Sequence, residues 1–308
     1  MLDILLKIMP LFALVAIGYF CKSKTIINAQ GLKYLTHFVM YLSLPAVLLG
    51  KLSTTDFATL IDIPFLIAYL LSLASVILIA GAIGYLVFEK NKKNSIMLGL
   101  GGVYGNIGFL AIPVLTTTVG EWVSVPLALM LTLDLLILLP LATFLLQLTN
   151  TSENSQSTPL KALKRSLLNP LILSIALGLL LSVLEVQLPN DLLSGLGWLG
   201  SAAGPCAMFI VGTALFGRKV SQKPMAALYI SAIKLLIMPF VVFVFMSMLN
   251  VDSTWVVAAT LGASMPCAAV LGVIAEEHKA IPHQASTAVL LTTIFSVISI
   301  PVLINLFN

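Results

Sequence analysis

Apolar runs of about 20 residues alternate with short polar segments along the whole chain, a pattern typical of helices that cross a bilayer. Hydrophobic residues make up 59% of the sequence and charged residues 9%, whereas soluble domains carry roughly 25% charged residues. The sequence therefore predicts an all-α polytopic membrane protein. Its ten predicted spans, numbered 1 to 10 below, cover 4–21, 34–50, 63–88, 95–117, 122–148, 167–184, 192–216, 224–249, 253–275 and 284–307.

The two halves of the chain resemble each other. The longest polar connection, 149–165, predicts a cytoplasmic linker between a first repeat, 1–148, and a second repeat, 166–308. Because each half holds five spans, the second copy must enter the membrane upside down. The sequence thus predicts two inverted five-helix repeats. A shift of 160 residues places Pro10 on Pro170, Gly18 on Gly178, Pro45 on Pro205 and Pro64 on Pro224.

Basic residues are distributed unevenly among the predicted loops. The loops after spans 2, 4, 6 and 8 hold only Lys51. Basic loops face the cytoplasm, so both termini are expected outside a cell membrane. The basic residues form small clusters, which excludes an extended nucleic-acid surface. The loops after spans 1, 3, 5, 7 and 9 hold Lys22, Lys24, Lys33, Lys90, Lys92, Lys93, Lys161, Lys164, Arg165, Arg218, Lys219, Lys223 and Lys279.

The residue types that metal sites and enzymes need are sparse. Cys21, Cys206 and Cys267 stand alone, without a CxxC motif or histidines at ligand spacing. DDxxD, HExxH and GxSxG motifs are missing from the sequence. We therefore expect no metal, no cofactor and no enzymatic activity.

Spans 4 and 9 contain residues that break helices. Gly105, Gly108 and Pro113 lie in span 4, and Ser264 and Pro266 lie at similar depth in span 9. Proline removes a backbone donor and clashes with the preceding turn, at about 3 kcal/mol in an ordinary helix. Paired interruptions in an inverted repeat predict a transport site, where helix N-termini attract an anion. Alternatively, the glycines only allow close packing and the prolines only kink the helices.

The segment "YGNIGFLAIPVL" in span 4 resembles the N-x-G-F-x-x-x-P pattern of the auxin efflux carrier family, whose bacterial members include permeases for small organic acids. Five further segments resemble this family in the same order. They are "YLSLPAVLL", "NPLILSIALGLLL", "AAGPCAMFIVGTAL", "KLLIMP" and "ASMPCAAVLG".

The resemblance implies a fold in which spans 4 and 9 unwind and cross beside a central site. Spans 1, 2, 6 and 7 would form a scaffold, and the other six a mobile transport unit. Asn106, Pro113 and Pro266 match family positions associated with the crossing and the substrate pocket. The plant carriers have a long cytoplasmic loop, whereas the corresponding segment 149–165 is short here. Regulation of this protein by phosphorylation of such a loop is therefore not expected. Together with the interrupted spans, this predicts that the substrate site includes Gly105, Asn106, Gly108, Pro113, Ser264, Met265 and Pro266.

Two charged residues fall inside predicted spans. Asp134 lies halfway along span 5 and Lys234 lies in span 8. Such charges are costly in a bilayer and usually face a cavity or a partner. Lys234 could act as a built-in cation at the crossing, Asp134 could carry a proton, or the two could pair and only brace the bundle.

The sequence predicts a secondary transporter of small organic anions, mono- or dicarboxylates including auxin-like acids, that works by alternating access. The expected partners are the anion and the lipid bilayer. The sequence is also compatible with a homodimer. One alternative is a sodium-coupled symporter of the bile-acid type, although the interrupted spans lack acidic residues at mid-depth. Another is a transporter-like membrane receptor without flux.

Overall fold

The computed structural model describes residues 2–55, 62–88, 90–149, 167–217, 221 and 224–307, with side chains from residue 9 onward. Within these ranges every regular element is a helix, and one isolated β-bridge joins Gly105 to Cys267. The chain forms two compact units, each built from three stretches of sequence. The first unit comprises Met1–Ile63, Gly108–Thr132 and Leu167–Gly217, and the second comprises Pro64–Ile107, Leu133–Ser166 and Arg218–Asn308.

Some sequence predictions fall outside the described residues. Nearly all of the predicted linker, 150–165, is among them, so its structure stays a prediction. The same holds for six of the basic loop residues: Lys161, Lys164, Arg165, Arg218, Lys219 and Lys223.

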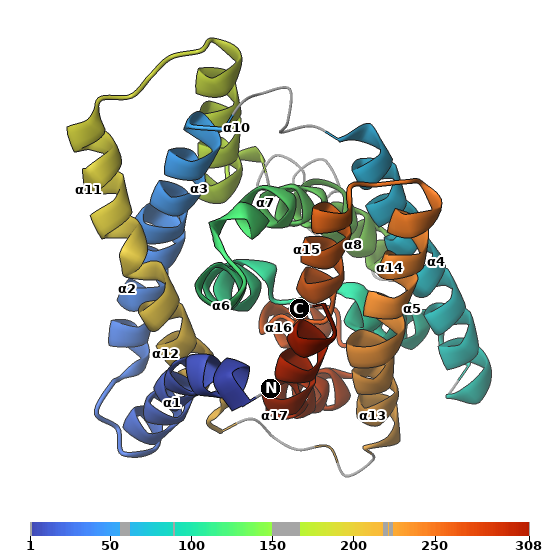
Figure 1. The fold of residues 1–308 in the computed structure, drawn as a ribbon. Coiled ribbons are helices and arrows are strands. Elements are labelled where there is room, and N and C mark those ends of the chain that lie inside the picture. Colours follow the sequence, from blue (N-terminus) through green and yellow to red (C-terminus); the bar gives the residue numbers. More distant parts are fainter. Residues whose placement is uncertain are drawn as a thin grey trace. The chain divides into compact units, whose positions relative to one another are not determined.

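The first unit is built from α-helices of 7 to 22 residues (Figure 1). Within it, α1 packs along α12, and α3 packs against both α10 and α11. The helices are α1 (Leu2–Ser23), α2 (Ala29–Phe38), α3 (Leu44–Ser53), α6 (Ile112–Thr118), α10 (Pro170–Val183), α11 (Asn190–Ser201) and α12 (Ala203–Leu215), with the 3-10 turn η4 (Glu121–Val123) and most of α7 (Ser124–Leu133).

The second unit holds the longest helices, α4 and α17 (Figure 1). It also holds the gap between α5 and Ile107 and the gap between α15 and α16. Within it, α14 packs on α15, and α17 packs on α13 and α16. The helices are α4 (Ile63–Val87), which enters this unit at Pro64, α5 (Lys92–Val103), α8 (Leu139–Leu148), α13 (Met225–Ala232), α14 (Met238–Met248), α15 (Ser253–Ala263), α16 (Val270–Glu277) and α17 (Pro282–Phe307).

Many of these helices are long and apolar enough to cross a membrane. Among the described residues, six continuous helical stretches meet this criterion, and four shorter apolar helices occupy further predicted spans. The prediction of a helical, multi-span membrane protein is therefore confirmed. The six stretches are Ala29–Ser53, Ile63–Val87, Glu121–Leu148, Asn190–Leu215, Met225–Met248 and Pro282–Phe307; the shorter helices are Met9–Ser23, Ile107–Thr118, Pro170–Val183 and Ser253–Ala263.

In the described ranges, four five-residue π-helical segments each end two residues before a proline. A proline has no N–H, and its ring clashes with the carbonyl four residues earlier. A π-turn widens the helix locally and lets it continue past the proline. The segments are Val39–Ser43 before Pro45, Ile107–Ala111 before Pro113, Asp134–Leu138 before Pro140 and Ile233–Ile237 before Pro239.

Pro113 therefore does not interrupt its helix, contrary to the prediction from the sequence. The sequence suggested that Pro113 breaks span 4, but the chain is helical from Ile107 through Thr118 and passes Pro113 at the start of α6. The break lies before this helix, at Tyr104 to Asn106. Widening to a π-helix relieves the clash that would otherwise interrupt the chain at the proline.

Two glycines in the first unit allow neighbouring helices to approach closely. A Cβ on Gly18 of α1 would clash with the carbonyl oxygen of Phe209 in α12. A Cβ on Gly178 of α10 would lie 2.8 Å from Leu52 Cβ and 3.5 Å from the Leu49 carbonyl oxygen in α3. Small residues at helix interfaces are a common packing device in membrane proteins.

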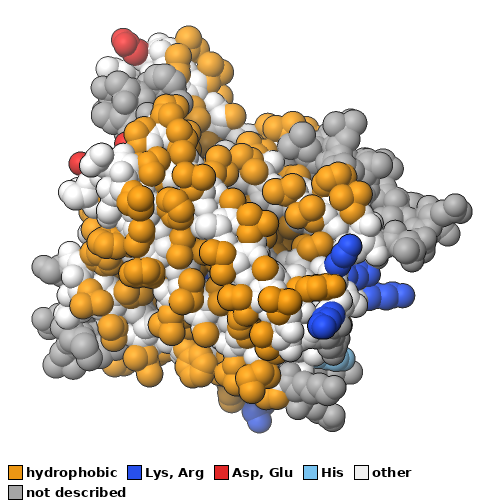
Figure 2. All heavy atoms as spheres, turned by 90° about the vertical axis from the view of Figure 1, so that its right-hand side faces the viewer, with side chains coloured by type: hydrophobic (Ala, Val, Ile, Leu, Met, Phe, Trp, Pro, Cys, Tyr) orange, Lys and Arg blue, Asp and Glu red, His pale blue; other side chains and the backbone are white. Residues whose placement is uncertain are grey.

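The surface carries many exposed apolar side chains. Leu78, Ile79 and Leu86 on α4 are all exposed. Figure 2 shows the face that lies to the right in Figure 1, where hydrophobic side chains dominate and Lys or Arg side chains gather near one margin. Such an apolar surface suits contact with lipid rather than with water.

Candidate functional site

The first helix interruption follows the glycine-rich end of α5. This helix ends at Val103, and Tyr104 turns to an extended conformation with φ −72° and ψ 99°. Helical structure resumes at Ile107. Gly101, Gly102 and Gly105 have low helix propensity, so the sequence itself weakens the helix here.

The second interruption follows α15. This helix ends at Ala263, and α16 begins at Val270. Ser264 caps the end of α15, since its hydroxyl donates to the Leu261 carbonyl at 2.7 Å. Pro266 lies inside the gap and brings no backbone donor. Gly105 and Pro266 thus fall in the two interruptions, whereas Pro113 does not.

The two interruptions pair with each other inside the second unit. Gly105 and Cys267 form an antiparallel bridge. The backbone N–H of Asn106 donates to the Pro266 carbonyl at 2.9 Å, and that of Ala268 donates to the Tyr104 carbonyl at 3.2 Å. These bonds satisfy backbone groups that neither helix can satisfy, which is the condition for non-helical backbone at membrane depth.

Lys234 places a buried cation beside this bridge. Its side chain is 1% exposed, and its Nζ donates to the Ala263 carbonyl at 2.7 Å. That carbonyl belongs to the C-terminal end of α15, where the helix dipole favours a positive charge. A Cβ on Gly105 would lie 2.9 Å from Lys234 Nζ, so the glycine makes room for the ammonium group.

Asp134 is equally buried but has a different partner. Its side chain is 1% exposed, and the Tyr69 hydroxyl donates to its Oδ1 at 3.0 Å. Its Oδ2 has no hydrogen-bond partner among the described residues. Such an atom is uncommon in a folded protein and marks a candidate functional group.

The bracing pair suggested by the sequence is not formed. Across the described residues, the ion pair within 4.0 Å joins Lys51 to Glu121 and does not involve Lys234 or Asp134. Each of the two buried charges instead binds a neutral group, the Ala263 carbonyl for Lys234 and the Tyr69 hydroxyl for Asp134.

The structure divides the predicted site residues between the two units. Gly108 and Pro113 belong to the first unit. The other predicted residues lie in the second unit, and those from the two interruptions are adjacent through the bridge. The second-unit residues are Gly105, Asn106, Asp134, Lys234, Ser264, Met265 and Pro266.

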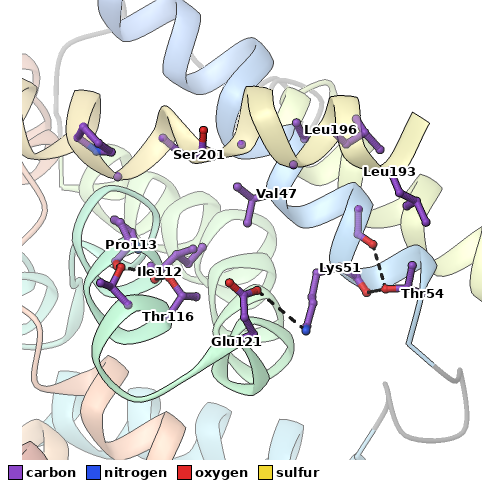
Figure 3. A pocket seen from close by; sticks show the side chains of 18 of the residues that line it. Val47, Lys51, Thr54, Ile112, Pro113, Thr116, Glu121, Leu193, Leu196 and Ser201 are labelled. Carbon is purple, nitrogen blue, oxygen red and sulfur yellow. Dashed lines mark hydrogen bonds and ion pairs between the residues drawn. The ribbon is translucent and has the colours of Figure 1, made fainter. Parts of the chain in front are cut away.

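Pro113 lines a cavity of about 680 Å³ that lies wholly within the first unit. Figure 3 shows Val47 and Lys51 of α3, Pro113 of α6 and Leu196 of α11 around it. Lys51 Nζ lies 4.0 Å from a carboxylate oxygen of Glu121. The sequence did not predict this cavity, although Lys51 stood out as the only basic residue in the loops after predicted spans 2, 4, 6 and 8.

These features define a class of protein. Helices interrupted side by side within a polytopic helical protein, with polar groups at the gap, are typical of secondary transporters. The comparison with protein families agrees, because the model of the family described as "Membrane transport protein" matches residues 3–304. The chain belongs to this family, which is the auxin efflux carrier family, and is a membrane transporter.

Curated relatives align along almost the full chain. A protein named "Putative malonate transporter" from Rhizobium meliloti (strain 1021) is 28% identical over 303 residues, which cover 98% of this chain and 95% of the relative. An "Uncharacterized transporter" from Methanothermobacter thermautotrophicus (strain ATCC 29096 / DSM 1053 / JCM 10044 / NBRC 100330 / Delta H) is 25% identical over 298 residues, which cover 96% and 95%.

Proposed function

We propose that this protein is a secondary transporter that moves small organic anions, mono- or dicarboxylates, across the cell membrane by alternating access. The observation that carries the proposal is the bridge between the interruptions at Gly105 and Cys267, with the Lys234 ammonium beside it. Malonate is the first substrate to test, since it appears in the name of one relative. The proposed substrate site includes Gly105, Asn106, Ser264, Met265 and Pro266 of the second unit; Gly108 and Pro113, which the sequence predicted for the same site, belong to the first unit.

The register of the bridge supports two inverted repeats. The 160-residue shift maps Asn106 onto Pro266, and these two residues are joined by the hydrogen bond at 2.9 Å. A two-fold axis that relates the repeats brings equivalent residues next to each other where the chain crosses the axis. Asn106 and Pro266 are such a pair, and the bridge between Gly105 and Cys267 is formed by one neighbour of each.

Helix packing in the first unit supports the same symmetry. The 160-residue shift maps Gly18 onto Gly178 and Leu49 onto Phe209. The close approach of Gly18 to Phe209 therefore has a counterpart in the approach of Gly178 to Leu49. We accordingly retain ten spans in two repeats, 1–148 and 166–308, with both termini outside, as the proposed topology.

The electrostatics of the bridge favour an anion. Lys234 supplies one positive charge, and its Nζ has three N–H donors, of which Ala263 accepts one. The α16 N-terminus adds partial positive charge near Pro266. In this proposal, Lys234 replaces the cation that a sodium-coupled carrier would bind, so transport needs no sodium.

Asp134 is the proposed proton carrier. A membrane potential of about 100 mV, negative inside, drives an anion outward by about 2.3 kcal/mol per charge, so uptake needs a coupling ion. The Oδ2 of Asp134, which has no hydrogen-bond partner in the described part of the chain, can accept that proton. Export, in contrast, would proceed without coupling.

Counterflow in liposomes tests the proposal. Purified protein is reconstituted into vesicles loaded with malonate, malate, lactate or an indole acid, and entry of the labelled acid is measured with and without sodium. We expect saturable, sodium-independent counterflow of at least one acid. Strict sodium dependence would favour the symporter, and binding of an acid without flux would favour the receptor. Absence of both binding and flux for the whole panel would overturn the proposal.

A further inference from the structure

The cavity in the first unit has one cationic and one anionic side chain in an otherwise uncharged lining. Lys51 of α3 and Glu121 of η4 are these two residues. The walls around them include the apolar side chains of Val47, Ile112 and Leu196 (Figure 3). A lysine beside apolar walls can bind an amphipathic anion where the anion displaces the neighbouring carboxylate.

The hydroxyl groups of Thr54, Thr116, Thr117 and Ser201 in the lining already donate hydrogen bonds to backbone carbonyls. Thr54 donates to the Gly50 carbonyl at 3.1 Å, and Thr116 donates to the Ile112 carbonyl at 2.7 Å. Thr117 and Ser201 likewise donate to carbonyls of their own helices. Lys51 is thus the side chain of the lining that can offer free donors to an anion.

The contact between Lys51 and Glu121 is loose. The two charged atoms are 4.0 Å apart, and the side chains are 32% and 74% exposed. Exposed ion pairs of this kind contribute little to stability, because water solvates both charges and holding two long side chains costs entropy. Another carboxylate can therefore replace Glu121 at Lys51 at little cost.

We propose that this cavity is an anion-binding subsite, in which Lys51 binds the carboxylate of a small organic monoanion and Glu121 is a built-in competitor for the same cation. The inference rests on the proposed function, because it assigns to this subsite the monocarboxylates among the anions that the protein is proposed to transport. The apolar remainder of the ligand packs against Val47, Ile112 and Leu196.

The same pair disfavours dianions. A dicarboxylate bound at Lys51 would keep a second negative charge near Glu121 or against apolar walls, and neither offers it a partner. Butyrate and malonate are matched probes, because they are similar in size and differ by this second charge. The subsite is expected to bind butyrate more tightly than malonate at pH 7.

Isothermal titration of the purified full-length protein with butyrate tests the subsite. Lys51→Gln is expected to weaken binding about tenfold, the loss of one charge-assisted contact. Glu121→Gln is expected to strengthen butyrate binding about two- to fivefold, because the competitor is removed. An unchanged or weaker affinity in Glu121→Gln would contradict the competitor role.

A control separates this inference from the proposed function. If Lys51→Gln binds butyrate as the unchanged protein does while Lys234→Met does not, the subsite is wrong and the proposed transport site stands. If the unchanged protein binds neither butyrate nor malonate and exchanges no acid in liposomes, both proposals fail. Tighter binding of malonate than of butyrate that also depends on Lys51 would overturn the monoanion assignment.

Discussion

Gly105 lies directly against the ammonium group of Lys234: a Cβ at Gly105 would be 2.9 Å from Nζ and 3.1 Å from Cε. Gly105 itself forms the backbone bridge to Cys267, so a side chain at this position would require the Lys234 ammonium group to move. The glycine thus does more than weaken a helix, because it sets the distance between a buried charge and the paired backbone segments.

Gly105→Ala is expected to displace the Lys234 side chain and to destabilise the fold by about 1 to 3 kcal/mol, the usual cost of overpacking. Gly108→Ala is the matched control in the same segment. There the nearest atoms to an added Cβ are 4.0 Å away, so stability should change little. Thermal unfolding of both purified variants measures the difference; equal melting temperatures would contradict the close packing around Lys234.

Lys234→Met tests the charge separately from the packing of the stem. Methionine keeps a long apolar side chain but cannot neutralise the C-terminal end of α15 or attract an anion. We expect flux to fall at least about a hundredfold, as for the loss of an essential charged contact, in protein that still folds. Liposome counterflow at matched folded yield measures this effect. Flux close to that of the unchanged protein would limit Lys234 to a packing role.

Asp134→Asn tests proton coupling. The amide cannot take up a proton at neutral pH, while it keeps the size of the side chain and an acceptor for the Tyr69 hydroxyl. Uptake driven by a pH gradient should be lost, whereas exchange of labelled for unlabelled acid should persist. Comparison of these two assays on one preparation gives the answer. Gradient-driven uptake by Asp134→Asn would remove Asp134 from the coupling mechanism.

A cysteine placed in 153–158 tests the orientation. These residues lie outside the described structure, but basic residues in this and neighbouring loops predict that they face the cytoplasm. In a background without Cys21, Cys206 and Cys267, a membrane-impermeant thiol reagent should label this cysteine only in inverted vesicles. Labelling in intact cells would reverse the proposed topology.

The sequence allowed both helix interruptions to be predicted, because glycine and proline act on the backbone locally. It did not reveal the role of Pro113, since the balance between a break and a π-helix depends on the packing around the proline. It left open whether Lys234 and Asp134 pair, because their partners, Ala263 and Tyr69, are distant in sequence.

The cavity in the first unit was inaccessible to sequence reasoning for the same reason. Lys51 and Glu121 are far apart in the chain and meet only after α3 and η4 have folded into one unit. Neither residue belongs to a motif. Their proximity is a property of tertiary structure, which apolar periodicity alone does not encode.

The affinity of Asn106 variants for the acid with the largest flux tests most directly whether the paired interruptions bind an anion. Asn106→Ala should weaken binding by about one to two orders of magnitude, which corresponds to a charge-assisted hydrogen bond of about 1.5 to 3 kcal/mol. Asn106→Asp keeps the size of the side chain but places a carboxylate against the anion, so at neutral pH it should bind more weakly than the alanine variant. An aspartate variant that binds the acid as tightly as the unchanged protein would contradict an anion site at the bridge.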